Sequence, residues 1–122
     1  QYRQVLGMAD AKATIGEFGC DLAEKKLSQL EADGVEVDPA IRRGVEVKRA
    51  WLNNKATDGE MKAAHNDLYV ATTQRNYKYD AYYFAAMVTS RKWTDRYTLH
   101  RYLDEDQRAE LIKRIQDLLA GD

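Results

Sequence analysis

Residues Tyr82–Val88 have the sequence YYFAAMV, and the fold class depends on whether this apolar run is a helix or a strand. Its aromatic side chains suit a β-strand. The alanines and the methionine in the run favour a helix, however, and neither a hairpin turn nor a partner strand is visible near it. We therefore predict a helix that begins near Lys78. Because this helix is apolar nearly all round, we expect it to lie mostly buried at the centre of the fold.

Two stretches of helical length lie toward the N-terminus. Residues 9–32 repeat apolar side chains every three or four positions, and Asp33-Gly34 is expected to end that helix. The second begins at Asp38-Pro39, an N-cap acceptor followed by proline at the first helical position. The apolar faces are Ile15, Phe18, Leu22, Leu27 and Leu30 in the first helix and Ile41, Val45 and Leu52 in the second, with Trp51 beside the second stripe.

Two further stretches carry their own start signals. Thr57 followed by Glu60 fits a capping box, and Asp104 is expected to cap a last helix over Glu105–Ala120, which Gly121 would end. Their apolar faces are Met61, Ala64, Leu68 and Ala71 in the third helix and Leu111, Ile112, Ile115, Leu118 and Leu119 in the last. Turns are expected at residues 33–38, 53–59, 74–77 and 103–104. The sequence thus predicts an all-α fold, a compact antiparallel bundle of about five helices that forms a single helical domain over residues 1–122.

Composition narrows the classes of protein. The 122 residues include 19 Lys or Arg and 20 Asp or Glu, a formal charge of −1 that disfavours a generally basic nucleic-acid binder. The longest apolar runs fall far short of the about 18 residues that span a bilayer, so no membrane segment is predicted. Gln1–Leu6 lack the basic start and the apolar core of a secretory signal peptide, so no such signal is predicted there. Cys20, the single cysteine, cannot form an internal disulfide. Together these features suggest a cytoplasmic protein.

Catalytic and metal-binding motifs are not visible, so we expect no enzyme activity, no cofactor and no metal. Neither His65 nor His100 follows a glutamate by three residues, and the glycines form no phosphate-binding loop. We interpret Cys20 as a packed, unreactive thiol. His65 is expected to line a helix face and to donate a hydrogen bond.

One segment stands out by its composition. Residues 75–103, called here the basic aromatic segment, hold six Lys or Arg against two Asp, and eight of the twelve aromatic residues. Three interpretations remain open: the rings fill the core while the cations pair with acidic helix starts; exposed members dock an acidic patch of a protein partner; or the rings stack on nucleic-acid bases. The docking interpretation nominates these partner-binding residues: Tyr77, Tyr79, Arg91, Trp93, Arg96, Tyr97 and Arg101.

The run from Leu22 to Thr72 contains Leu22-Ala23-Glu24, the Asp38-Pro39 cap, the Arg49-Ala50-Trp51 motif and the turn and alanine-containing helix of Asn54–Ala64. In these features it resembles the immunity proteins found beside bacterial polymorphic toxins. Such proteins often continue into an alanine-rich helix with histidines, whereas this chain has a tyrosine-rich stretch. The resemblance implies an all-α protein that blocks a toxin by covering one of its surfaces.

From these observations we expect a small helical binding protein, an immunity or inhibitor factor that neutralises another protein, such as a toxin or effector with an acidic surface, by stoichiometric association. The alternative is a nucleic-acid-binding accessory protein that uses the basic aromatic segment. The sequence leaves the oligomeric state open.

Overall fold

The computed structural model describes residues 9–75, 78–90, 93 and 96–120, with the backbone alone at 9, 10, 96 and 97. The described residues form six α-helices and no strand, which confirms the all-α prediction. The helices are α2 (Ala9–Ala32), α3 (Pro39–Leu52), α4 (Asp58–Val70), α5 (Asp80–Thr89), α6 (Arg96–Tyr102) and α7 (Glu105–Ala120). A π-helical turn, η1 (Ala71–Arg75), continues α4.

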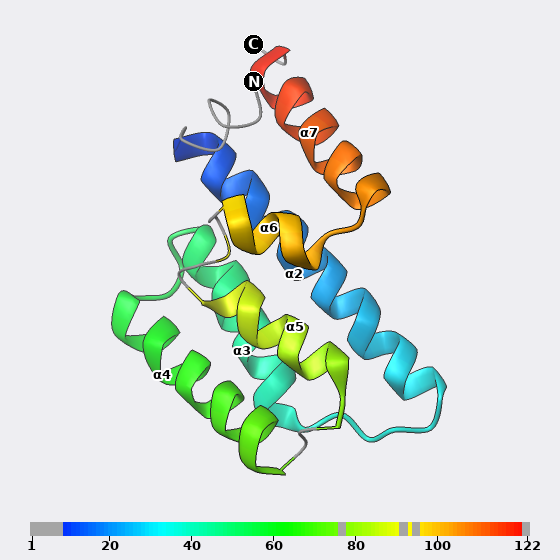
Figure 1. Cartoon of the computed structure of the whole chain (residues 1–122). Coiled ribbons are helices and arrows are strands. Elements are labelled where there is room, and N and C mark those ends of the chain that lie inside the picture. Colours follow the sequence, from blue (N-terminus) through cyan, green and yellow to red (C-terminus); the bar gives the residue numbers. More distant parts are fainter. Residues whose placement is uncertain (1–8, 76–77, 91–92, 94–95, 121–122) are drawn as a thin grey trace.

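Helices α2 to α5 run alternately up and down, so that sequence neighbours lie antiparallel (Figure 1). Helix α3 packs against α2, α4 and α5, and α5 also packs against α2. Helix α7 returns along α2. One continuous apolar cluster joins all six helices, and its largest fully buried side chains include Phe18, Leu68, Tyr82, Trp93 and Leu111.

Local capping chemistry sets the helix ends much as the sequence predicts. Asp38 accepts a hydrogen bond from the Ala40 amide at 3.0 Å and Pro39 opens α3. The capping box at the start of α4 is present, and Asp104 and Gln107 form a reciprocal pair of the same kind at the start of α7. Gly34, with φ of 90°, ends α2 in a turn closed by the Val35 amide on the Leu30 carbonyl at 3.0 Å. The predicted stop at Gly121 lies outside the described residues.

The predicted central helix is mostly buried but shorter than expected. The sequence predicts one helical segment from Lys78 to the turn at 103–104, whereas α5 ends at Thr89 and α6 begins at Arg96. The hydroxyls of Thr89 and Ser90 donate to carbonyls of the preceding turn, which offers the backbone an alternative to continuing the helix. The break lets the Trp93 indole reach the core and donate to the Ile15 carbonyl at 2.9 Å.

The apolar face predicted for the last helix is only half correct. Leu111 and Ile115 are buried, whereas Leu118 and Leu119 are 41% and 48% exposed. Helix α7 is anchored to α2 near its middle, where the Arg114 guanidinium lies over the Phe18 ring and pairs with Asp21. Its last turn extends beyond those contacts, so an apolar sequence pattern there does not lead to burial.

Candidate functional site

A groove of about 1240 Å³ opens between the start of α2, the end of α3, the start of α4 and the end of α5. Among the residues that the structure describes, its charged or aromatic lining residues are Lys12, Lys48, Trp51, Asp58, Lys62, His65 and Trp93. The turn between α3 and α4 shapes its mouth. Asn54 adopts φ of 59° there, and the Lys55 amide donates back to the Ala50 carbonyl at 2.7 Å. This turn brings α4 back alongside α3.

Lys48 lines the groove as a buried cation. It occupies the same stripe of α3 as the core residues Ile41 and Val45, and only 7% of its surface is exposed. Its ammonium lies 4.8 Å from the centroid of the Trp51 ring. Among the described side chains no carboxylate forms an ion pair with it. Burial lowers the pKa of Lys48 below its ordinary value, because it disfavours the charged form.

Trp51 is held in place at the mouth of the groove. Its indole nitrogen donates to a carboxylate oxygen of Asp58, the first residue of α4, at 2.7 Å. The ring therefore bridges the end of α3 and the start of α4, with one face turned to the Lys48 ammonium. The sequence alone left Trp51 between core packing and binding, and the structure places it half-buried in the groove wall.

His65 lines the groove from α4, and it forms a hydrogen bond as the sequence predicts. Its Nδ1 lies 2.7 Å from the Thr89 hydroxyl oxygen. Because that hydroxyl donates toward carbonyls of its own helix, its oxygen accepts from Nδ1–H of the neutral imidazole. Burial, together with the nearby Lys48 ammonium, holds the pKa of His65 below its ordinary value.

The pKa of His65 predicts a pH dependence of stability. The unfolded chain takes up a proton at this residue near pH 6.5, whereas the folded protein does so only at lower pH. We expect the free energy of unfolding to decrease as the pH falls from about 6.5 toward the lowered pKa, because the unfolded state binds more protons in that window. Urea unfolding between about pH 7.5 and about pH 5 measures this. His65→Gln should remove this part of the decrease, whereas His100→Gln, at an exposed histidine, should keep it. Identical pH profiles for wild type and His65→Gln would contradict the prediction.

The burial of Lys48 predicts that replacing this lysine with an apolar residue stabilises the protein. Methionine fills a similar volume without a charge, so Lys48→Met is expected to raise the free energy of unfolding by about 1–2 kcal/mol. Lys26→Met is the matched control. Lys26 also lies over an aromatic ring, that of Phe84 at 4.9 Å, but it is exposed. We expect that change to stay within about 0.5 kcal/mol. If Lys48→Met destabilises the protein more than Lys26→Met does, interactions within the fold outweigh the cost of burying the Lys48 ammonium.

Charge around the groove is unbalanced. Lys12 and Lys62 are exposed on its rim and Lys48 is buried within it, against Asp58 as the described acidic lining residue. Asp58 already accepts the Trp51 hydrogen bond. The described lining of the groove therefore presents a surplus of positive charge to an entering group.

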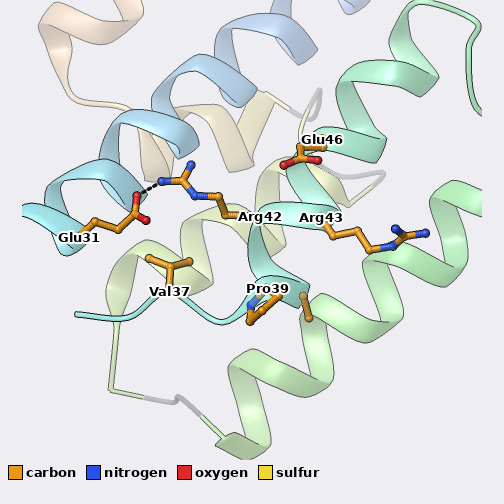
Figure 2. A pocket seen from close by; sticks show the side chains of 7 residues that line it. Glu31, Val37, Pro39, Arg42, Arg43 and Glu46 are labelled. Atoms are coloured by element: carbon orange, nitrogen blue, oxygen red, sulfur yellow. Dashed lines mark hydrogen bonds and ion pairs between the residues drawn. The ribbon is translucent and has the colours of Figure 1, made fainter. Parts of the chain in front are cut away.

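A second, shallower depression of about 520 Å³ lies beside the turn between α2 and α3. Figure 2 shows Glu31 and Arg42 reaching toward each other across it, and the two form an ion pair. Arg43 and Glu46 also line the depression, so its charges balance. It therefore offers no surplus of charge for recognition.

The structure separates the partner-binding residues nominated from the sequence. Trp93 is 1% exposed and packs edge-on against Phe84 at 5.4 Å, so it is a core residue and not an exposed anchor. Tyr79 is half-buried with its ring 5.1 Å from that of Tyr82. Arg101 is exposed, and its guanidinium lies 5.8 Å from the Tyr102 ring centroid.

The other nominated residues are only partly described or not at all. Arg96 and Tyr97 lie in α6, but their side chains are outside the described part of the chain. Tyr77 and Arg91 are outside it entirely. Arg75 pairs with Asp38 at the start of α3, as expected if a cation of this segment binds an acidic helix start.

The remaining candidate groups add no second site. Cys20 is buried between α2 and α3, and burial raises the pKa of its thiol to about 12, which supports a packed, unreactive thiol. No three His, Cys, Asp or Glu side chains gather as metal ligands in the described part of the chain. In that same part, every helix is too short or too polar to cross a membrane.

Sequence reasoning missed the groove, although one signal for it was present. Lys48 falls seven residues after Ile41 and three after Val45, which places a lysine on the apolar stripe of a predicted helix. A cation at a core position is uncommon and often marks a functional residue. Comparison with protein-family models, with curated proteins and with solved structures finds no match to this chain.

Proposed function

We propose that the protein is a small helical binding protein that neutralises another protein by stoichiometric association, as an inhibitor or immunity factor does. The observation that carries this proposal is the groove with its surplus of lysines, which suits an acidic surface of a partner. Its volume of about 1240 Å³ leaves room for a protein segment.

Two further observations support this proposal. Lys48, Trp51, Asp58, Lys62 and His65 all fall within residues 22–72, the part of the chain that resembles immunity proteins. The buried Lys48 ammonium is expected to weaken the fold, a trade commonly found where a residue serves function. We further propose a cytoplasmic location, which suits a chain with a single cysteine.

The nucleic-acid alternative receives less support. It needs aromatic rings free to stack on bases. Tyr82, Phe84 and Trp93, three of the rings in the basic aromatic segment, are 0%, 5% and 1% exposed. Their burial removes these three rings as stacking platforms for bases.

A charge-reversal experiment tests the proposal. The tagged protein is used to isolate its partner from the source cells, and native mass spectrometry should show an equimolar complex. Lys12→Glu combined with Lys62→Glu should weaken that complex about tenfold or more, and added salt should weaken the wild-type complex. Lys25→Glu combined with Lys113→Glu makes the same charge change at exposed residues away from the groove and should leave affinity nearly unchanged.

Two outcomes would overturn this function. Equal weakening by both pairs of substitutions would show that net charge, not the groove, governs binding. A gel shift with single-stranded or duplex nucleic acid at micromolar protein, with no protein complex formed, would favour the alternative function.

A further inference from the structure

We propose that the groove recognises a side-chain carboxylate, an Asp or Glu of the partner, by pairing it with the buried Lys48 ammonium. This inference rests on the proposed function and names the chemical group that the groove takes. Lys48 is the most deeply placed cation of the groove lining, and its partner among described side chains is an aromatic face, not an anion. A carboxylate is the protein group that best compensates such a cation.

The surroundings of Lys48 limit what can enter. The Trp51 ring covers one side of the ammonium and is itself held by its hydrogen bond to Asp58. His65, kept neutral by burial and by Lys48, adds no competing positive charge at neutral pH. The entering group must therefore reach past exposed rim lysines to a buried ammonium. A negatively charged side chain on an extended segment has the reach and the charge for this.

The exposed lysines on the rim of the groove and the buried Lys48 are expected to affect different steps of binding. Lys12 and Lys62 are exposed, so their attraction for an acidic segment acts over distance and is screened by salt. Lys48 is buried, so its attraction acts only on a group that has entered, and salt screens it less. Rim substitutions should mainly slow association, whereas loss of Lys48 should mainly speed dissociation.

Capped peptides provide the direct test. The probe is acetyl-(Gly-Glu)3-amide, with acetyl-(Gly-Gln)3-amide as its uncharged counterpart. A third peptide, acetyl-hexaglycine with a free C-terminus, offers a carboxylate from the other source. Binding to the full chain is followed by amide NMR shifts and by Trp fluorescence, with peptide up to about 10 mM. We expect the Glu peptide to shift residues of the groove, and the other two peptides to bind at least about tenfold more weakly.

Two lysine variants assign the effect to Lys48. Lys48→Met should weaken the Glu peptide at least about tenfold, whereas Lys26→Met, also a lysine over an aromatic ring, should leave it unchanged within about twofold. Since Lys48→Met is expected to be more stable than wild type, its loss of binding cannot be attributed to unfolding. Thermal unfolding of each variant confirms that it is folded.

The outcomes separate this inference from the proposed function. Equal binding of the Glu and Gln peptides, no groove shifts with the Glu peptide, or unchanged binding by Lys48→Met would overturn the carboxylate pairing. Tighter binding of acetyl-hexaglycine than of the Glu peptide would show that the groove takes a C-terminal carboxylate and not a side-chain carboxylate. A protein complex that is weakened by the rim substitutions but not by Lys48→Met would leave the function standing without this inference. Lys48-dependent peptide binding with no protein complex would support the pairing and remove the function.

Discussion

Trp93→Ala is expected to lower the free energy of unfolding by about 3–5 kcal/mol, the largest change among single substitutions considered for this protein. The side chain is 1% exposed, meets Phe84 edge-on and donates its indole hydrogen to the Ile15 carbonyl of α2. Alanine removes the ring contacts and leaves a cavity that the surrounding helices fill only in part. Urea unfolding at neutral pH, checked by thermal unfolding, measures the loss.

Trp93→Phe is the graded control. Phenylalanine keeps an aromatic ring beside Phe84 but cannot donate to the Ile15 carbonyl, so an intermediate loss is expected. If Trp93→Ala changes the free energy of unfolding by less than about 1 kcal/mol, the indole does not contribute to the core as the structure indicates. The nomination of Trp93 as an exposed anchor would then reopen.

Gly44→Val is expected to lower the free energy of unfolding by about 2–3 kcal/mol. Gly44 lies where α3 crosses α4, and a Cβ there would stand 2.4 Å from Cδ1 and 3.1 Å from Cβ of Leu68. The Cδ1 atom can rotate away, but the Leu68 Cβ moves only with the backbone of α4. The two helices would therefore have to separate. Thermal and urea unfolding of the variant measure the effect.

A glycine elsewhere provides the matched control. Gly59 is exposed at the start of α4, and a Cβ there would have its nearest neighbour 3.9 Å away, at the Thr57 hydroxyl. Gly59→Ala is expected to be neutral or to stabilise by up to about 1 kcal/mol, through helix propensity alone. In a protein that already carries Leu68→Ala, adding Gly44→Val should lower the free energy of unfolding by less than it does in the wild-type protein. A Gly44→Val protein as stable as wild type would show that the helices do not meet so closely.

The helix ends were predictable because their causes are local. Asp38-Pro39, Thr57 with Glu60, and Asp104 act on amides within three residues, so the sequence contains the whole interaction. The buried faces of α3 and α4 follow from the same short-range periodicity. The break after Thr89 combines local hydroxyl bonds of Thr89 and Ser90 with the Trp93 hydrogen bond to Ile15. That second contact joins residues 78 positions apart, which no local pattern in the sequence contains.

The candidate site was predicted poorly for a related reason. Composition directed attention to the basic aromatic segment, yet the Trp93 and Tyr82 rings of that segment belong to the core. The groove instead combines residues from α2, α3, α4 and α5, which no single sequence window contains. Lys48 could have been selected as a cation on an apolar stripe, but its neighbours Trp51 and His65 become a site only through packing of α3 against α4.

The buried thiol between α2 and α3 can be used as a probe of how often those helices part. The Cys20 sulfur lies 4.0 Å from the Val45 carbonyl oxygen and is fully covered. An alkylating reagent reaches it only in molecules whose helices have opened, so the alkylation rate reports the frequency of that opening. With one sulfhydryl in the chain, a single mass increment counts each opened molecule. A dye could also be attached at an added surface cysteine while Cys20 remains in place.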